Sequence, residues 1–173
     1  MDEFRQFEDG SDGEADDLFR YEPAFANFIV KKTNEEFTII GVHIQKDSVV
    51  KELNNLVDLY DHIVDEFGTE NVIFTGDFNA EGSYLRKKDK SEVKLLTDPR
   101  FKSLISDEAD TTVAKSDEAY DRIFVAGKLF KNVNKGETFR FDKEFGLTPE
   151  EAFKVSDHYP IQFQLYCEKK FFK

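Results

Sequence analysis

The chain has 173 residues, enough for one globular domain, and its hydrophobic content of 39% and aromatic content of 14% argue against a disordered protein. Its net charge of −12 speaks against binding nucleic acid through basic residues alone, and favours either a metal-dependent phosphate site or no phosphate ligand. No apolar run is long enough for a membrane span, no signal peptide is visible in the first thirty residues, and the single cysteine, Cys167, cannot form an internal disulfide.

The first 18 residues form an acidic segment with eight carboxylates and one arginine, Arg5. On composition alone, like-charge blocks of this kind are usually flexible, solvated loops. Carboxylates spaced around Gly10 and Gly13 also suit an oxygen-rich calcium loop. At this point both interpretations of the acidic segment stay open.

From residue 24 onward the pattern is that of an ordered domain. Strands are predicted at Phe25–Val30 and Phe37–His43, and an amphipathic helix is predicted to begin near Ser48 and to end at Gly68. Val72–Thr75 follows as a buried strand. A strand, a helix and a strand in succession indicate a crossover, so the strands on either side of the helix should be parallel in one sheet.

The second half of the chain continues this alternation. The pattern predicts a short helix near Pro99–Ile105, a polar loop over Asp107–Glu118, a strand at Arg122–Ala126, a last strand at Ile161–Leu165, and a basic, aromatic surface tail over Cys167–Lys173. Helices that alternate with apolar strands predict the α/β class, with residues 1–173 as a single domain.

Five polar residues fall at strand ends that would share one edge of the sheet. His43 ends one parallel strand, and Asp77 and Asn79 follow the other. Asp121 and His158 precede later strands, whose starts reach the same edge if those strands are antiparallel. Each residue alone has a structural explanation, since a lone histidine is usually structural and Asp and Asn favour turns. Together they offer an acid, a base, a cation ligand and an oxyanion donor, a set suited to phosphodiester hydrolysis.

Several stretches resemble the signature stretches of the endonuclease/exonuclease/phosphatase superfamily, and within it of the deoxyribonuclease I group. In chain order they are DDLFRYEP, GVHIQ, GDFNAEGSY, DEADTT, AYDRIFVAG, FGLT and SDHYPI, and together they cover nearly the whole chain. GDFN and SDH are superfamily-level motifs, whereas AYDRI and ADTT narrow the resemblance to the deoxyribonuclease I group. The resemblance implies part of a four-layer α/β/β/α sandwich with mixed parallel and antiparallel sheets.

The same resemblance implies an endonuclease that hydrolyses double-stranded DNA as a monomer with Mg²⁺ and Ca²⁺, and actin is a weaker implied partner. His43 and His158 would be the general acid and base, with Asp121 orienting His158. The implied Mg²⁺ ligands are Asp77 and Asp157, the implied phosphate donor is Asn79, and the implied substrate contacts are Arg20 and Tyr21, where Tyr21 aligns with a phosphate-binding arginine of the family.

The resemblance also implies two structural calcium loops. One would be formed by Asp110, Thr112 and Ser116, and the other by Asp9, Asp17, Phe19 and Glu22. The second set favours the calcium interpretation of the acidic segment. The cysteines of the family's disulfides fall at Ser11, Glu14, Gly82 and Glu118, so those disulfides are absent here.

The resemblance begins inside the family's chain, and an N-terminal portion of the family has no counterpart here. In the family that portion supplies strands of one sheet, an Asn and a Glu near the cation, and a Glu that pairs with the histidine matching His43. We therefore expect little or no nuclease activity from this chain as written. The alternatives are a non-catalytic relative, such as a regulatory or actin-binding half-domain, or another phosphoesterase acting on sugar or lipid phosphates. The compartment stays undecided.

Overall fold

A computed structural model describes residues 4–10, 17–115 and 117–166 of the chain. Its strands are β1 (Arg5–Gln6), β2 (Ala24–Val30), β3 (Glu35–His43), β4 (Val72–Asp77), β5 (Phe101–Ser103), β6 (Asp121–Ala126), β7 (Glu137–Thr138) and β8 (Ile161–Gln162). Its α-helices are α1 (Val49–Phe67), α2 (Lys94–Thr97), α3 (Phe141–Glu144) and α4 (Pro149–Val155), and the 3-10 helices are η1 (Lys90–Glu92) and η2 (Gly127–Lys131).

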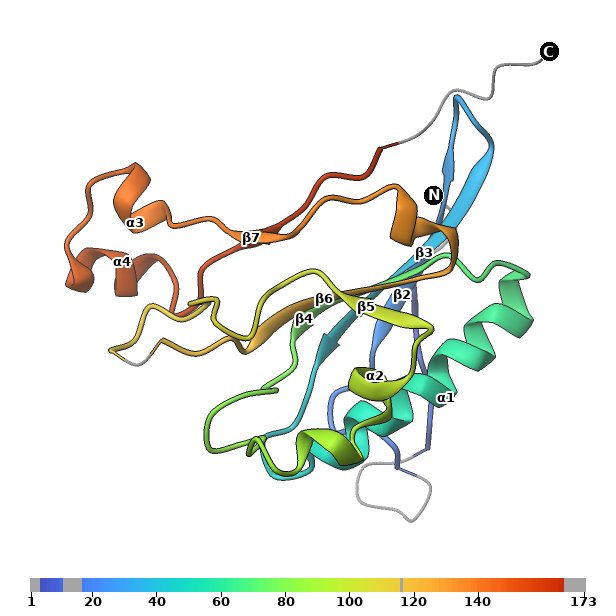
Figure 1. The fold of residues 1–173 in the computed structure, drawn as a ribbon, viewed down its shortest axis with the longest axis horizontal. Coiled ribbons are helices and arrows are strands. Elements are labelled where there is room, and N and C mark those ends of the chain that lie inside the picture. Colours follow the sequence, from blue (N-terminus) through green and yellow to red (C-terminus); the bar gives the residue numbers. More distant parts are fainter. Residues whose placement is uncertain (1–3, 11–16, 116, 167–173) are drawn as a thin grey trace.

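Six strands form one mixed sheet in the order β1-β2-β3-β4-β6-β5 (Figure 1). β3 and β4 are parallel, and every other neighbouring pair is antiparallel. The predicted crossover is therefore confirmed, with α1 connecting the parallel pair. β6 runs antiparallel to β4, so the start of β6 meets the end of β4 at one edge of the sheet.

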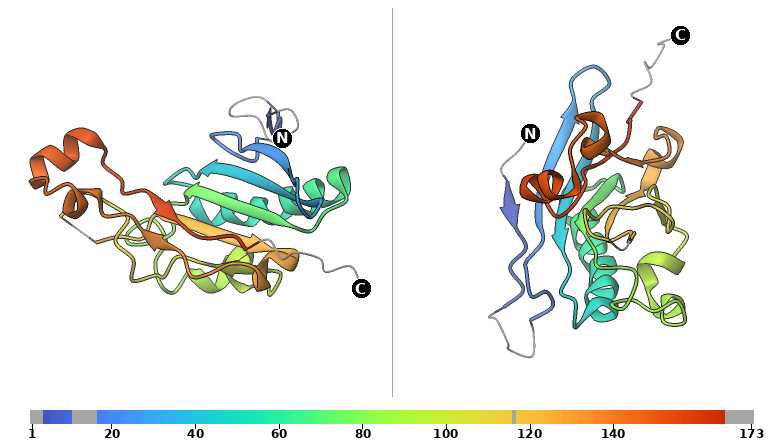
Figure 2. Two further views of the ribbon diagram at one scale, coloured as in Figure 1. Left: turned by 90° about the horizontal axis from the view of Figure 1, so that it is seen from above. Right: turned by 90° about the vertical axis from the view of Figure 1, so that its left-hand side faces the viewer.

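α1 packs its apolar stripe against one face of this sheet (Figure 2). Its buried residues recur at helical spacing and include Val49, Leu53, Leu56, Tyr60 and Ile63. The predicted end at Gly68 is confirmed, because Gly68 adopts the left-handed conformation with a φ of 68°. The buried carboxylate of Glu52 accepts hydrogen bonds from the Ser48 hydroxyl at 2.6 Å and from the Gln45 amide at 3.0 Å, which ties the helix start to the loop after β3.

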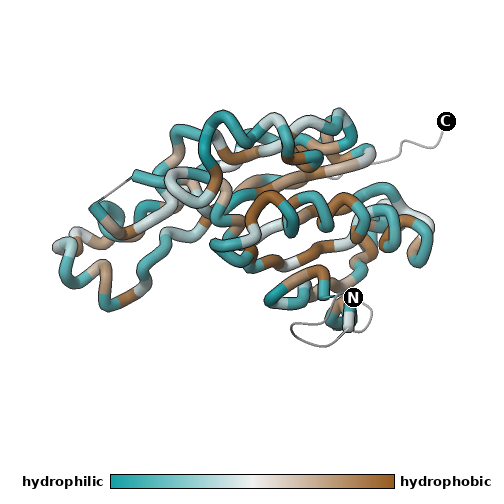
Figure 3. The backbone as a smooth tube through the Cα atoms, turned by 90° about the horizontal axis from the view of Figure 1, so that it is seen from below, coloured by the Kyte–Doolittle hydropathy of each residue, from teal (hydrophilic) through white to brown (hydrophobic). Residues whose placement is uncertain are grey.

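The other face of the sheet carries a second apolar cluster. Ile73, Ile123 and Val125 point to this face, where they pack with residues of the segment that contains β7 and β8. β7 and β8 pair as a small antiparallel sheet over the large one (Figures 1 and 2). Many of the most hydrophobic residues lie in the middle of the molecule (Figure 3). The predicted α/β class is confirmed, and no helix of the described ranges is long and apolar enough to cross a membrane.

Three sequence predictions about elements were wrong or incomplete. The helix predicted over Pro99–Ile105 is absent, because α2 ends before Pro99 and the chain then forms the edge strand β5. The last predicted strand is reduced to β8, and Leu165 forms only an isolated bridge. Part of the acidic segment is ordered as β1, which pairs with β2, while residues 11–16 and the tail 167–173 lie outside the described residues.

α3 and α4 were not predicted, although α4 has a clear signal in the sequence. Thr148 begins it with a capping box, in which the Thr148 hydroxyl accepts from the Glu151 amide and the Glu151 carboxylate accepts from the Thr148 amide. Pro149 occupies the first helical turn, where its missing N–H costs nothing. The TPEE stretch is therefore the signal by which this helix can be recognised.

Candidate active site

Three of the predicted site residues lie in one row across the large sheet. His43 at the end of β3 is the register partner of Asp77 on β4, and Asp77 is the register partner of Asp121 at the start of β6. Residues directly opposite one another on neighbouring strands project to the same face. The three side chains therefore share one edge of one face, and His43 Nε2 lies 3.8 Å from Asp77 Oδ2.

His158 joins this row through a hydrogen bond with Asp121, whose Oδ2 lies 2.7 Å from His158 Nδ1. A bridge with Thr112 and a hydrogen bond from the His158 amide to the Ser156 hydroxyl fix the backbone at this point. The hydrogen bond with Asp121 raises the pKa of His158 above 6.5, and it outweighs the opposing effect of burial. This is the geometry in which a carboxylate orients an imidazole and stabilises its protonated form.

The raised pKa of His158 predicts a pH dependence of stability. The folded chain binds this proton more tightly than the unfolded chain, so the Asp121–His158 pair stabilises the fold below pH 6.5 and loses that contribution as the pH rises through the folded-state value. We expect the urea midpoint of the wild type to fall more than that of Asp121→Asn between about pH 6 and about pH 8. Equal changes in the two proteins, followed by circular dichroism, would contradict this assignment.

Asp77 and Asn79 form a tight turn at the end of β4. Asp77 Oδ1 accepts from the Asn79 amide at 2.9 Å, and Asn79 adopts a φ of 47°. Asn79 is fully buried, and its Nδ2 donates to the Ile44 carbonyl at 2.8 Å, which fixes the loop after β3. Burial raises the pKa of Asp77, so its negative charge is disfavoured here unless positive charge lies nearby.

Tyr21 lies against His43, with their ring centroids 4.9 Å apart. The His43 side chain is 58% exposed, and it contacts the tyrosine ring and Asp77. Tyr21 is itself half-exposed, and the backbone of its neighbour Arg20 donates to Glu52. Of the predicted substrate contacts, Tyr21 therefore lies beside one of the two histidines.

Asp77 and Asp157 are the predicted magnesium ligands. The described part of the chain has no group of three His, Cys, Asp or Glu side chains arranged to hold a metal ion. Asp157 is exposed. Asp77 supplies a carboxylate, and the buried Oδ1 of Asn79 has no hydrogen-bond partner. Because Mg²⁺ is usually held by one or two carboxylates and several waters, these oxygens fit one side of such a site.

In the first predicted calcium loop, the carboxylate of Asp110 is paired with an arginine. The Asp110 carboxylate accepts from Arg140 Nη1 at 2.7 Å and from the Thr112 amide at 3.2 Å, so both of its oxygens have partners. Ser116, the third predicted ligand, lies outside the described residues. A guanidinium therefore lies beside the carboxylate that the resemblance assigns to calcium.

In the second predicted loop, Asp9 connects the two described parts of the chain on either side of residues 11–16. Asp9 Oδ2 accepts from the backbone amides of Leu18 and Phe19, at 3.0 and 2.8 Å. The Asp17 carbonyl accepts from a lysine, and the Glu22 carboxylate accepts from Gln6. Asp9 therefore orders the described part of this segment, and the calcium assignment stays a prediction.

Two of the positions that carry cysteines in the family lie next to each other. A Cβ atom added at Gly82 would lie 2.9 Å from a carboxylate oxygen of Glu118. The other pair, Ser11 and Glu14, lies outside the described residues. The spatial adjacency of Gly82 and Glu118 agrees with the resemblance, although this chain has no disulfide there.

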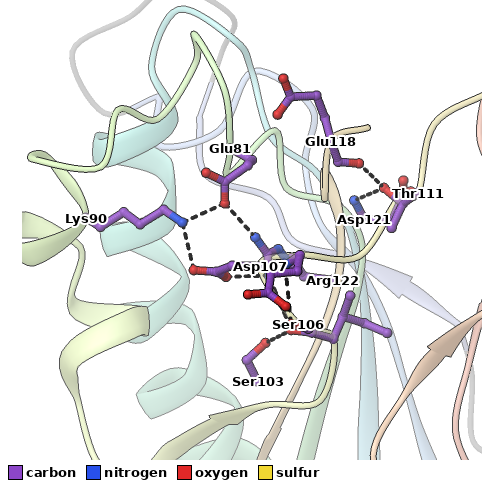
Figure 4. Close-up of polar contacts among 11 residues, drawn as sticks. Glu81, Lys90, Ser103, Ser106, Asp107, Thr111, Glu118, Asp121 and Arg122 are labelled. Carbon is purple, nitrogen blue, oxygen red and sulfur yellow. Dashed lines mark hydrogen bonds and ion pairs between the residues drawn. The ribbon is translucent and has the colours of Figure 1, made fainter. Parts of the chain in front are cut away.

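The sequence interpretation missed a buried ion network beside the site (Figure 4). Arg122 is 3% exposed, and its guanidinium donates to Asp107 at 2.7 Å, to Glu81 at 3.1 Å and to the Ile105 carbonyl at 3.3 Å. Lys90 donates to the same two carboxylates, at 2.9 Å to Asp107 and 2.6 Å to Glu81. In the sequence, the sign of this network is an arginine within the mostly apolar strand β6.

This network connects the two sides of the site. Glu81 lies in the loop that follows Asn79, and Arg122 directly follows Asp121 on β6. The ion pair between Glu81 and Arg122 therefore fixes the turn after β4 relative to the strand that carries the partner of His158.

By sequence, the chain is similar to deoxyribonucleases. It is 41% identical over 170 residues to deoxyribonuclease gamma of Mus musculus, an alignment that covers 95% of this chain and 54% of the relative. The human deoxyribonuclease gamma is 42% identical over the same length, and the mouse deoxyribonuclease-1 is 39% identical over 92% of this chain and 58% of the relative. The chain thus spans a little over half the length of these relatives. No protein-family model matches it.

Solved structures show the fold at much lower identity. The endonuclease domain of TRAS1, a telomere-specific non-LTR retrotransposon, aligns with a TM-score of 0.61 at 14% identity, over 95% of this chain and 67% of that one. Truncated TDP2 of Caenorhabditis elegans aligns with a TM-score of 0.61 at 15% identity, over 96% and 66%. The chain is therefore similar in sequence to deoxyribonucleases over nearly its whole length, and its fold is similar to that of solved endonuclease/exonuclease/phosphatase proteins.

Proposed function

We propose that this chain supplies the general acid and the general base of a divalent-metal-dependent site that hydrolyses phosphodiester bonds in double-stranded DNA. The observation that supports it best is the Asp121–His158 hydrogen bond of 2.7 Å, made in the same row as Asp77 and His43. The identity of about 40% between this chain and deoxyribonucleases supports DNA as the substrate class.

In the proposed reaction the two histidines have opposite roles. Asp121 stabilises the protonated imidazole of His158, so His158 takes the proton from a water molecule that attacks phosphorus. His43 gives a proton to the leaving sugar oxygen as its bond to phosphorus breaks. A divalent cation held by Asp77, when bound, would stabilise the charge that develops on the phosphate. Arg20 and Tyr21 are proposed to contact the phosphates. Asn79 is fully buried and its Nδ2 donates to the Ile44 carbonyl, so the predicted contact of Asn79 with the phosphate is replaced by a role in fixing the turn after β4.

Plasmid nicking tests this function with the chain alone and with a chimera that joins it to the preceding, unmatched portion of mouse deoxyribonuclease gamma. We expect little or no nicking by the chain alone, and nicking by the chimera in Mg²⁺ and Ca²⁺. His158→Gln and Asp121→Asn should each lower the chimera's rate by about 100-fold or more, the usual contribution of general acid–base catalysis.

His62→Gln is the matched control, because His62 is an exposed histidine on α1 and is not in the row. A folded chimera that nicks equally well with and without His158 would refute the proposed role, and a folded chimera without any nicking would refute the proposed activity. A substrate panel of sugar and lipid phosphates distinguishes the phosphoesterase alternative. Actin binding and a monomeric state stay predictions from the resemblance.

A further inference from the structure

The loop at residues 110–113 contacts both members of the Asp121–His158 pair. Thr112 forms an antiparallel bridge with His158. The Thr111 hydroxyl accepts from the Asp121 amide at 3.1 Å, and the same hydroxyl donates to the Glu118 carbonyl (Figure 4). Any displacement of this loop therefore changes the backbone that presents the carboxylate and the imidazole to each other.

Arg140 holds this loop from outside the row. Its Nη1 donates to Asp110 at 2.7 Å, and its Nε and Nη2 form a forked pair with the carboxylate of Asp142 at 3.0 and 2.8 Å. The guanidinium also lies 4.2 Å above the ring of Tyr159, the residue after His158. The side chains of Arg140, Asp110 and Asp142 are 31%, 19% and 16% exposed, so all three are largely withdrawn from water.

The shape of the guanidinium suits this position. It is planar and always charged, so one edge can bind Asp142, another can bind Asp110, and its face can stack on Tyr159. A calcium ion at Asp110 would need six to eight oxygen ligands and would be repelled by the positive charge already bound there. The Thr112 amide occupies the other Asp110 oxygen.

We propose that Arg140 is a positioning residue that acts as a built-in cation for the 110–113 loop, in place of a bound calcium ion, and thereby holds His158 against Asp121. A covalently attached cation cannot dissociate, so the geometry of this side of the site is independent of the calcium concentration. The inference concerns the fold around His158 and goes beyond the proposed function, because it holds whether or not the chain cleaves DNA.

Proton NMR of the full chain tests the positioning role. The imidazole N–H that is bonded to Asp121 should give a low-field resonance, identified by its loss in His158→Gln. We expect Arg140→Gln to weaken or abolish this resonance and Arg140→Lys to retain it in part. Arg100→Gln is the matched control, because Arg100 also binds two carboxylates, those of Asp98 and Asp61, on the α1 side of the sheet.

The expected pattern is a lower melting temperature for both glutamine variants but a changed resonance only for Arg140→Gln. An Arg140→Gln variant that keeps the wild-type resonance would overturn the positioning role. Neither readout uses catalysis, so a failure here is distinct from a failure of the proposed activity.

Calcium titration tests whether Arg140 takes the place of a bound calcium ion. Because Arg140 is intact in this experiment, the result is informative even if Arg140→Gln does not fold. The titration uses the Asp9→Asn chain, which removes the other candidate calcium ligand. We expect its melting temperature to be the same in EDTA and in calcium chloride. A calcium-dependent increase that Asp110→Asn then abolishes would show that calcium binds this loop, and would overturn the inference.

Discussion

Replacing Arg122 with alanine is expected to lower the free energy of unfolding by about 3 kcal/mol, the low end of the range for removing one partner of a buried ion pair. The substitution leaves the carboxylates of Glu81 and Asp107 side by side with only Lys90 between them. The low end applies because the Asp107 side chain is 64% exposed and water can partly replace the lost partner. Urea unfolding followed by circular dichroism measures the loss.

Arg86→Ala is the matched control for this experiment. Arg86 is also paired with a carboxylate, that of Asp89, but its side chain is 64% exposed. Exposed pairs contribute about 0–1 kcal/mol, so the control should lose little. If Arg122→Ala and Arg86→Ala lose the same small amount, the buried network does not stabilise the fold, and its role in connecting the two sides of the site is refuted as well.

Gly76→Ala is expected to cost about 3–4 kcal/mol, a large effect for a single substitution. Gly76 adopts a φ of 138°, a conformation that side-chain-bearing residues rarely adopt. A Cβ atom there would lie 2.0 Å from the Val42 carbonyl oxygen on the neighbouring strand. The methyl group would therefore push β3 and β4 apart at the step before the His43–Asp77 pair.

Gly41→Ala provides the control one step earlier in the same pair of strands. A Cβ atom at Gly41 would come no closer than 3.8 Å to its nearest neighbour, an ordinary contact, and no unusual φ is required there. The alanine should be tolerated to within about 0.5 kcal/mol. Thermal and urea unfolding measure the stability of both variants. Equal stability of Gly76→Ala and Gly41→Ala would refute the steric argument.

The sequence allowed the central architecture to be predicted because its signals are local and repeated. The apolar spacing of α1, the glycine at residue 68 and the buried strand after it are each readable within a short window, and together they imply the parallel pair. The convergence of His43, Asp77 and Asp121 followed from strand direction alone. The register partners that align them in one row required the structure.

Contacts made by distant side chains were not predictable in this way. Glu81, Lys90 and Asp107 lie in polar loops, where nothing in the local pattern distinguishes them from solvated charges. Arg140 likewise lies in a stretch without a strong periodic signal, and its partner Asp110 was assigned to a metal through the resemblance. Partner choice among charged residues depends on how the loops pack, so it is a property of the tertiary structure.

The row that carries the site has a consequence for the order in which the site can form during synthesis. His43 and Asp77 become neighbours only after α1 has crossed between their strands, and Asp121 joins when β6 adds beside β4. His158 arrives last, from a segment that must first reach the 110–113 loop. A growing chain can therefore form the pairing of β3, β4 and β6 before residue 158 is available, so the Asp121–His158 hydrogen bond forms after the strands that support it.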